Sequence, residues 1–457
     1  MSICLCFNKP YSMHLFNSPK VNEAMQKDPV GIALFTLNKL ASSSFLDKVG
    51  LRKITEQLAY RLTKTGFQAI STTARAFTPA KKGTKPVHLP GETTELFDLN
   101  VTEEQQMVRE SVQAFAKEVL REQAESAEEA GAISADTLAT VQDLGLNLFA
   151  VPEPFGGVAT ESTTITSMLV AEDLAHGDMG QAVAILAPLS VANAITRWGT
   201  GEQQGTYLPA FVEENPPLAT IAVVEPKPLF NPHELSTTAT PEGDDYVLNG
   251  TKSLVPLAKD AELFLVAAQT PEGPKVFIVE GGTEGLTIGE DPAMGLRAAD
   301  PRPIHLHQVR VPKSQVLGDE SFDYQAFIDL GTLAWCALAV GTSQAVLDYV
   351  IPYANEREAF GEPISHRQAV AFMIADMAIE IDSMRILTWR AVSRAAQGKS
   401  FQREAYLART LCKQKAMEVG TNGVQLLGGH GYTKEYPVER WYRDLRAIGV
   451  AFGGLHL

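Results

Sequence analysis

Cysteine and histidine are the side chains that could bind a metal or act as nucleophiles in this 457-residue chain, and their spacing argues against both roles. The four cysteines contain no Cys-x-x-Cys pair, which predicts neither a zinc ribbon nor a disulfide framework. No metal-ligand spacing links His366, His430 and His456, so we predict no metal site. Cys336 and Cys412 lie in apolar stretches with helical periodicity, and we expect both to be small core residues.

The composition, with 45% hydrophobic and 20% charged residues, is typical of a soluble globular protein. No stretch approaches the roughly 20 consecutive apolar residues that a membrane-spanning helix requires, so we do not expect an integral membrane protein. The scattered cysteines fit a reducing compartment, and we expect a cytoplasmic protein that could be peripheral at the membrane. The net charge of −15 hides an asymmetry: residues 1–90 hold 13 Lys and Arg against 4 Asp and Glu, which leaves 26 against 50 in the remainder. We exclude nucleic acid as a partner of this acidic body, because affinity for phosphates comes from clustered cations.

Residues 1–97 have the composition of a basic extension and linker. Ile54, Leu58 and Leu62 recur every four residues with Lys and Arg between them, which predicts a basic amphipathic helix. Such a helix could make peripheral contact with an anionic membrane, or it could pack on the acidic body of its own chain, and both alternatives stay open. The Pro, Gly and Lys residues of 76–97 predict a polar linker.

The periodicity of the remaining chain divides it into three parts. A capping box at Thr102 and Gln105 starts a region of helical patterns, 98–215. Short β-rich runs separated by Gly, Pro and Asp follow in 216–320, and long helical periods return in 321–457. The order of helices, strands and helices predicts an α+β protein with a β domain between two helical domains.

Nine short motifs occur along residues 98–454 in an order that resembles the acyl-CoA dehydrogenase family of flavoproteins. They are Leu-Asn-Val-Thr-Glu-Glu-Gln-Gln106, Val-Pro-Glu-Pro-Phe-Gly-Gly157, Val-Glu-Pro226, Val-Leu-Asn-Gly-Thr-Lys252, Met-Gly-Leu-Arg297, Val-Arg-Val-Pro312, Glu-Arg-Glu-Ala-Phe-Gly361, Gln-Leu-Leu-Gly-Gly-His-Gly-Tyr432 and Tyr-Pro-Val-Glu-Arg-Trp-Tyr-Arg-Asp444. The resemblance implies an N-terminal helical domain, a central β-barrel and a C-terminal four-helix bundle.

The resemblance also implies a chemistry that this sequence is poorly equipped to perform. In the family a carboxylate removes the proton α to a thioester carbonyl while a hydride leaves the β carbon for the flavin of FAD. Phe452 stands where most members carry that base, and Gly331 stands where other members carry it. The position after Gly331, usually an arginine, is Thr332. Asp329 is a weak substitute, because two residues rotate a helix by about 200°.

The residues that would surround the flavin ring in the same subunit depart from the family pattern. The usual Thr-Glu-Pro-x-x-Gly-Ser-Asp turn reads Val-Glu-Pro-Lys-Pro-Leu-Phe-Asn231, so that Val224 replaces a hydroxyl and Phe230 replaces a serine. The usual Trp-Ile-Thr run reads Leu-Val-Pro256, and Pro256 has neither a hydroxyl nor an N–H to offer. We expect this half of the FAD site to be impaired.

The residues that the family presents to the FAD of a neighbouring subunit are retained. They are Arg357, Phe360, Gln425, Gly428 and Gly429. An arginine suits the diphosphate oxygens, and glycines allow close approach of a backbone to a dinucleotide. The alternative is that the glycines only end a helix and Arg357 forms a surface ion pair.

Two functions therefore remain in view. The first is an FAD-dependent acyl-CoA dehydrogenase that oxidises a fatty acyl-CoA in β-oxidation, as a homodimer or homotetramer, with its base not found. The second is a catalytically inactive partner subunit or scaffold that lends FAD contacts to another chain in a mixed oligomer.

Overall fold

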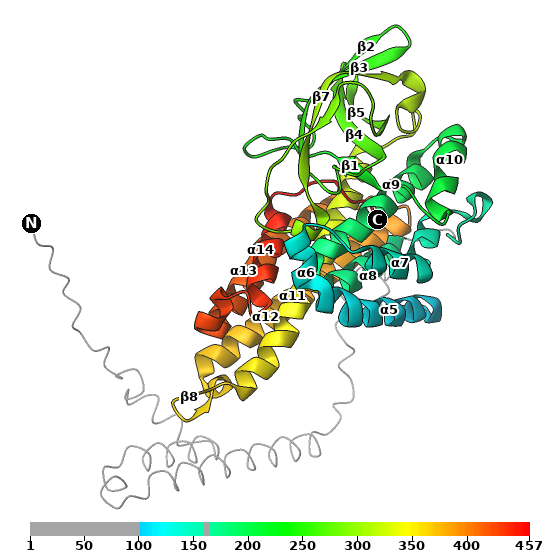
Figure 1. Ribbon diagram of the computed structural model, residues 1–457. Helices are drawn as coiled ribbons and strands as arrows, with labels where there is room; N and C mark the ends of the chain where they lie inside the picture. Colours follow the sequence, from blue (N-terminus) through cyan, green and yellow to red (C-terminus); the bar gives the residue numbers. More distant parts are fainter. Residues whose placement is uncertain (1–100, 160–163) are drawn as a thin grey trace, which may run out of the picture. The chain divides into compact units, whose positions relative to one another are not determined.

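The computed structural model describes residues 101–159 and 164–457 (Figure 1). Its contacts divide the chain into two units, 1–95 and 96–457, and the described residues belong to the second. The basic amphipathic helix and the linker expected in the first 97 residues lie outside the described part, so they remain predictions.

The first described helix begins at the expected capping box. The Thr102 hydroxyl accepts from the backbone N–H of Gln105, and the Gln105 side chain accepts from the backbone N–H of Thr102. Helix α5 (Glu103–Phe115) continues through a π-helical turn, η2 (Ala116–Leu120), into α6 (Arg121–Ala130), and left-handed Gly131 ends the run. The predicted helix start is confirmed.

Further helices complete the N-terminal domain. These are α7 (Ala135–Asp143), α8 (Thr164–Gly177), α9 (Met179–Trp198) and α10 (Gly201–Tyr207), with short turns η3 (Leu146–Ala150), η4 (Glu153–Phe155) and η5 (Leu208–Val212). Helix α8 is buried on most faces because it packs between α5, α9 and the long C-terminal helix α11.

The central domain is one mixed sheet of seven strands that forms a half-barrel. Its strands are β1 (Ala219–Ala222), β2 (Thr238–Glu242), β3 (Asp245–Val255), β4 (Leu263–Thr270), β5 (Gly273–Glu280), β6 (Leu286–Ile288) and β7 (Arg302–Pro312). They lie in the order β1-β4-β2-β3-β7-β6, and β5 pairs with β4. Two short turns, η6 (Arg297–Ala299) and η7 (Lys313–Gln315), flank β7. The strands gather at the end of this unit opposite the long helices (Figure 1).

Three long helices dominate the C-terminal domain, and the expected fourth member is short. They are α11 (Tyr324–Glu356), α12 (Gln368–Ala396), α13 (Gln402–Leu427) and the short α14 (Val438–Leu445). A hairpin of β8 (Glu358–Ala359) and β9 (Glu362–Pro363) and the turn η8 (Ile364–His366) join α11 to α12, and turns η9 (Gly428–Tyr432) and η10 (Arg446–Gly449) flank α14. The overall order confirms the predicted fold class.

Helix α11 is the centre of the molecule's second unit, since it contacts α8, α12 and α13. Among the described residues, α9 and α11 are long and apolar enough to span a membrane by composition, but 78% and 94% of their most apolar windows are buried in the core. Their apolar character therefore serves packing.

Candidate functional site

Phe452, the residue at the expected base position, lies in an aromatic stack. Its ring meets Phe230 edge to face, with centroids 5.9 Å apart and planes at 73°. On Phe452 also lies the guanidinium of Arg409, whose central carbon is 3.7 Å from the ring centroid. This stack joins the loop after β1 to helix α13, so side chains fill the space between them.

Arg409 is a charged residue in a largely buried place. Burial lowers its pKa, and its Nη1 atom has no hydrogen-bond partner among the described residues. A cation over a ring in a desolvated place contributes about 2 kcal/mol, so the Phe452 face partly compensates for lost hydration. Sequence reasoning missed Arg409; the available signal was an arginine inside the apolar α13 stretch before Cys412.

Gly331, the alternative base position, lies against the backbone of residues 453–457. A Cβ atom at Gly331 would lie 2.6 Å from the carbonyl oxygen of Leu455. The indole N–H of Trp335, one helical turn later, donates to the carbonyl of Gly453 at 2.7 Å. Any side chain at position 331 would displace this segment, which gives the glycine a packing role.

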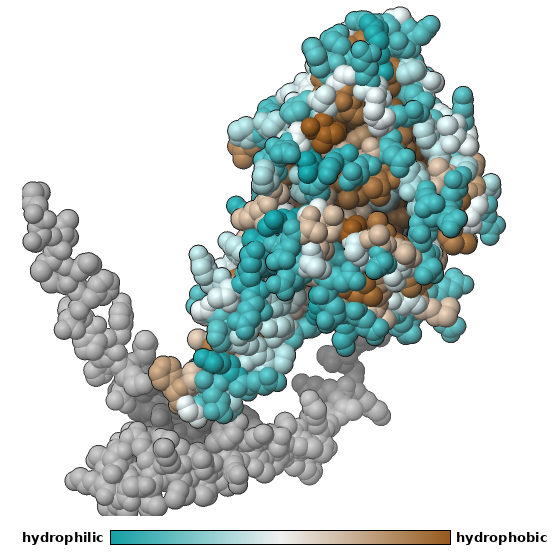
Figure 2. Space-filling model, viewed as in Figure 1, coloured by the Kyte–Doolittle hydropathy of each residue, from teal (hydrophilic) through white to brown (hydrophobic). Residues whose placement is uncertain are grey.

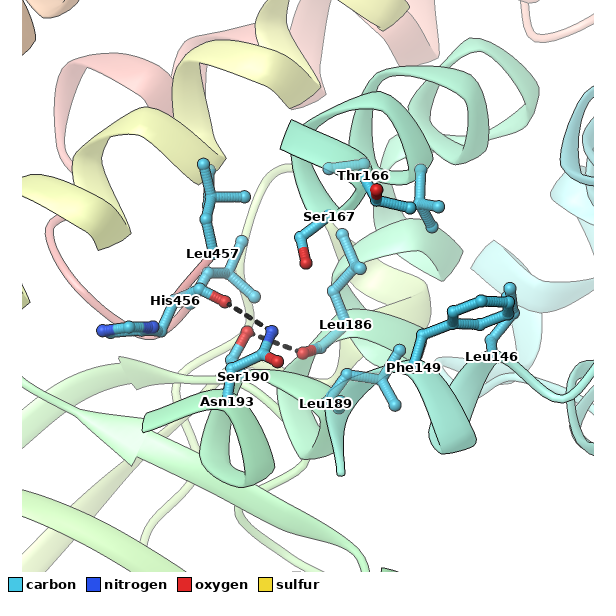
Figure 3. Close-up of a pocket in the computed structure, with 15 residues that line it drawn as sticks. Leu146, Phe149, Thr166, Ser167, Leu186, Leu189, Ser190, Asn193, His456 and Leu457 are labelled. Carbon is cyan, nitrogen blue, oxygen red and sulfur yellow. Dashed lines mark hydrogen bonds between the residues drawn. The ribbon is translucent and has the colours of Figure 1, made fainter. Parts of the chain in front are cut away.

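Residues 455–457 line an apolar cavity of about 40 Å³ (Figure 3). The opposite wall comes from η3, α8 and α9, and in Figure 3 Leu186, Leu189 and Asn193 of α9 lie across from His456 and Leu457. The ring of His456 accepts from the indole N–H of Trp198 at 3.2 Å. Burial, assisted by the charge of Arg197, lowers the pKa of His456 to about 3, so it is neutral.

The turn after β1 is fixed by a buried ion pair. Lys252 donates to Glu225 at 2.8 Å and to the carbonyl of Val223 at 3.2 Å. The Glu225 carboxylate also accepts from the backbone N–H groups of Ser236 and Thr237. Burial works to raise the pKa of Glu225, but Lys252 and these hydrogen bonds lower it overall, while burial lowers the pKa of Lys252 to about 8. The altered loop is therefore held firmly.

Asp329 is buried on α11 and accepts from Gln325 at 3.1 Å. Burial raises its pKa to about 6. It is not among the residues that line the cavity of Figure 3. A carboxyl group with this pKa can accept a proton at neutral pH, while Gln325, which donates to it, lies in the same helix. Thr332, three residues later on the same helix, is also buried.

A second, open cleft of about 350 Å³ brings most of the outward-facing residues together. It is lined by Arg357, Gln425, Gly428 and Gly429, together with Tyr353, Ile364, Leu426, Leu427 and His430. Arg357 is exposed, and no ion pair joins it to another described residue. The surface ion pair considered for it is therefore not found within the described chain.

The glycines of this cleft serve the turn and leave space. Gly428 ends α13 with φ of 59°, a backbone conformation that favours glycine. Nothing lies within 4 Å of a Cβ built at Gly428 or Gly429, so their backbone is open to a ligand. His430 fixes the far wall, because its ring stacks on Tyr436 with centroids 4.9 Å apart and its Nδ1 pairs with the Tyr353 hydroxyl at 2.9 Å.

Phe360 is apart from the residues that line this cleft. It is at the tip of the β8–β9 hairpin, 98% exposed, with a left-handed φ of 57°. Arg367 lies over its ring at 5.7 Å. Figure 2 shows apolar colour at the end of the bundle where Figure 1 labels β8. A large apolar side chain held outward in this way suits contact with another chain.

FAD is the cofactor that the resemblance implies, and the residues expected at its two ends fit it differently. The open cleft, with an exposed arginine, an amide and two uncovered glycines, fits an adenosine diphosphate group. The flavin side does not fit: Phe230 and Phe452 contact each other there. Pro256 is buried and lies about 4.0 Å from a Cβ built at Gly454. Within residues 101–159 and 164–457, no three His, Cys, Asp or Glu side chains are grouped to hold a metal ion.

Three family descriptions match consecutive parts of the chain. The acyl-CoA dehydrogenase N-terminal domain matches residues 102–215, the middle domain 220–309 and the C-terminal domain 324–454. The probable acyl-CoA dehydrogenase YngJ of Bacillus subtilis is 35% identical over 368 residues, which cover 78% of this chain and 96% of that protein. The human mitochondrial short-chain specific acyl-CoA dehydrogenase is 30% identical over 390 residues, which cover 83% of this chain and 94% of that protein.

Solved structures agree with this relationship. Butyryl-CoA dehydrogenase from Megasphaera elsdenii is 30% identical with a TM-score of 0.70, covering 77% of this chain and 95% of its own. An FAD complex of PigA is 26% identical, also with a TM-score of 0.70, over 77% and 94% of the two chains. The chain belongs to the acyl-CoA dehydrogenase family of FAD-dependent oxidoreductases.

Proposed function

We propose that this chain is a partner subunit of the family, which lends contacts to FAD bound by another chain and does not dehydrogenate acyl-CoA by itself. The observation that carries the proposal is the contrast between the two ends of the cofactor site. Phe230 and Phe452 close the flavin side, while Arg357, Gln425 and the glycines leave the adenosine side open. If only the residues that face a neighbouring subunit's FAD have a function, we expect the family residues to be lost on the flavin side and kept on the adenosine side.

Titration of FAD into the purified chain tests this proposal. We expect weak binding alone, and tighter binding when the chain is co-expressed with a relative that has intact flavin contacts. Arg357→Ala should abolish the gain, because it removes the cation from the open cleft. Arg310→Ala is the matched control and should keep the gain. Arg310 is an exposed arginine on β7 that pairs with Glu242 on β2. Tight saturation at one FAD per isolated chain would contradict the proposal.

A second candidate is α,β-dehydrogenation of a fatty acyl-CoA in β-oxidation, by a homodimer or homotetramer. The acyl-CoA dehydrogenase names of the relatives favour it, as do the apolar walls of the cavity in Figure 3, which would admit an acyl chain once residues 455–457 are displaced. Asp329 would then act as the base, since burial gives its carboxyl a raised pKa of about 6. Turnover of butyryl-CoA with an artificial electron acceptor, lost in Asp329→Asn and kept in the exposed variant Asp382→Asn, would establish this function.

Restoring a carboxylate at position 452 discriminates between the two candidates. Phe452→Glu would bring the carboxyl group next to Arg409, and an adjacent arginine lowers a carboxyl pKa by about 1 to 3 units. Such a group is a poor base at neutral pH, and Pro256 and Phe230 would still alter the flavin side. We expect turnover of butyryl-CoA to stay near background. Family-level turnover in Phe452→Glu would show that a missing base was the whole defect.

A further inference from the structure

Residues 453–457 occupy space inside the N-terminal helical domain, although they follow the last helix of the bundle in sequence. Leu455, His456 and Leu457 are 1%, 3% and 5% exposed. They lie between α11 and the wall formed by η3, α8 and α9 (Figure 3). An apolar segment is thereby placed where these helices would otherwise enclose a larger cavity.

Three side-chain hydrogen bonds hold the segment. Trp335 donates to the carbonyl of Gly453, Trp198 to the ring of His456, and Asn193 to the carbonyl of His456 at 3.4 Å. Two of the three donors, Asn193 and Trp198, come from α9, and both donate to polar groups of His456. The segment is therefore held by specific hydrogen bonds to its polar groups as well as by burial of its apolar side chains.

The remaining cavity is too small for an organic ligand. Its volume of about 40 Å³ leaves room for a few water molecules at most, whereas ligand sites span about 300 to 1,000 Å³. Its walls are mainly aliphatic and aromatic: Leu146, Phe149, Val170, Leu186 and Leu189. Ser190 is already satisfied by the carbonyl of Leu186. A linear aliphatic chain is the ligand chemistry that these walls suit.

The connection to the segment allows it to leave. Gly453 and Gly454 have left-handed φ values of 55° and 77°. Glycine reaches such conformations and the alternatives at little cost, so rotation at Gly454 can move residues 455–457 while Trp335 still holds Gly453.

We propose that residues 453–457 act as an internal plug that competes with an aliphatic acyl chain for this cavity. The acyl chain enters when the plug withdraws, so part of its binding energy is spent on displacing the plug. The apparent affinity for the acyl chain is the intrinsic affinity multiplied by the fraction of molecules in which the plug is withdrawn. The inference rests on the second candidate function only in taking acyl-CoA as the ligand class.

Hydrogen exchange on the full chain without added FAD tests the plug directly. Decanoyl-CoA is the probe, and free CoA is the control that has no acyl chain. We expect the backbone amides of 455–457 to be protected in the free protein and to exchange at least 10-fold faster with saturating decanoyl-CoA, but not with CoA. Unchanged protection with decanoyl-CoA bound would overturn the proposal, and so would failure to bind it in every variant.

Substitutions that loosen the plug give an independent measurement. Trp198→Phe with Asn193→Ala removes both donors to His456, and we expect decanoyl-CoA to bind roughly 25-fold tighter, since each net hydrogen bond is worth about a factor of five. Trp389→Phe on α12, a buried tryptophan that is not one of the three donors to the plug, is the matched control and should bind as the unmodified chain does. Equal affinity in all three proteins would refute the plug. If the double variant fails to fold, exchange in the unmodified chain decides. These readouts need neither flavin nor turnover, so the plug and the partner-subunit proposal can fail separately.

Discussion

Single residues in this protein show how a family site can lose its chemistry and keep its packing. At the inward half of the site the replacements are apolar and mutually compatible: Phe452 lies on Phe230, and Arg409 uses the aromatic face. The altered loop also keeps one buried ion pair. Lys252, fully buried, is neutralised by Glu225, which also receives two backbone N–H groups.

Lys252→Ala should therefore be strongly destabilising. It leaves the Glu225 carboxylate buried without its cation, and breaking a buried pair in this way costs about 3 to 5 kcal/mol. Urea unfolding should show a lower midpoint. The double variant Lys252→Met with Glu225→Gln should recover part of the loss, because no charge stays buried. Arg310→Ala, which breaks an exposed pair, should change the unfolding free energy by at most about 1 kcal/mol. Equal losses for Lys252→Ala and Arg310→Ala would contradict this reasoning.

His456 should make stability depend on pH. Its pKa falls from 6.5 in the unfolded chain to about 3 in the folded chain, mainly through burial. The folded state thus binds fewer protons between these values, so the stabilising contribution is fully present above pH 6.5 and is lost as pH falls towards 3. At pH 5 the loss is about 2 kcal/mol.

His456→Gln keeps an acceptor for Trp198 and removes the titration, so it provides the comparison. We expect the unfolding free energies of the two proteins to diverge as the pH falls from 7.5 to 5, the unmodified chain losing more. Parallel pH profiles would show that His456 is not buried in its neutral form.

At the scale of elements, the β8–β9 hairpin holds an exposed phenylalanine in a strained backbone conformation. Its two-residue turn, Phe360-Gly361, has left-handed φ at both positions, a geometry that prefers Asn-Gly. Phe360→Asn should raise the unfolding free energy of the isolated chain by about 1 kcal/mol, because a bulky residue is strained there. The same change should weaken FAD binding in a mixed oligomer if Phe360 contacts the neighbour.

Phe372→Asn on α12 provides the control for this prediction. Phe372 is also exposed but lies in a regular helix, so asparagine there should not stabilise the chain. A Phe360→Asn protein that is no more stable than the Phe372→Asn protein would argue that the turn is unstrained.

The sequence predicted the elements that have strong local signals. The Thr102 capping box placed the first helix, and the β-rich runs of 216–320 predicted a strand-built part between the helical ones. Strands β2 and β6 have weak local signals, since β2 is mostly exposed and contains Pro241, and β6 has three residues. Both owe their conformation to antiparallel pairing with the next strand along the chain, β2 with β3 and β6 with β7.

The candidate site was predictable only where motifs mark it. Arg357, Gln425, Gly428 and Gly429 line one cleft, and they come from two motifs that α11 and α13 bring side by side. The stack of Arg409 on Phe452 and the plug at 455–457 carry no motif. Their partners are more than 40 residues away in sequence, so only the folded chain reveals them.

At the scale of the whole molecule, the charge distribution is uneven. Residues 1–90 carry 13 Lys and Arg against 4 Asp and Glu, and the remainder is acidic. A cation near an anionic bilayer contributes about 1 kcal/mol, so a cluster of them can hold a protein at a membrane surface. We propose a cytoplasmic protein that uses this extension for peripheral contact with anionic lipid.

Co-sedimentation with vesicles tests this proposal and the competing one, in which the extension packs on the acidic body. The full chain should sediment with phosphatidylserine vesicles and much less with phosphatidylcholine vesicles, and deletion of residues 1–90 should abolish the difference. Binding should also fall steeply at about 1 M salt, where the Debye length is only about 3 Å. The deleted protein keeps all the described residues, so it also serves as the control for folding, through an unchanged unfolding midpoint. Equal sedimentation of the full and deleted proteins, together with a lower midpoint for the deleted one, would instead assign the basic extension to its own acidic body.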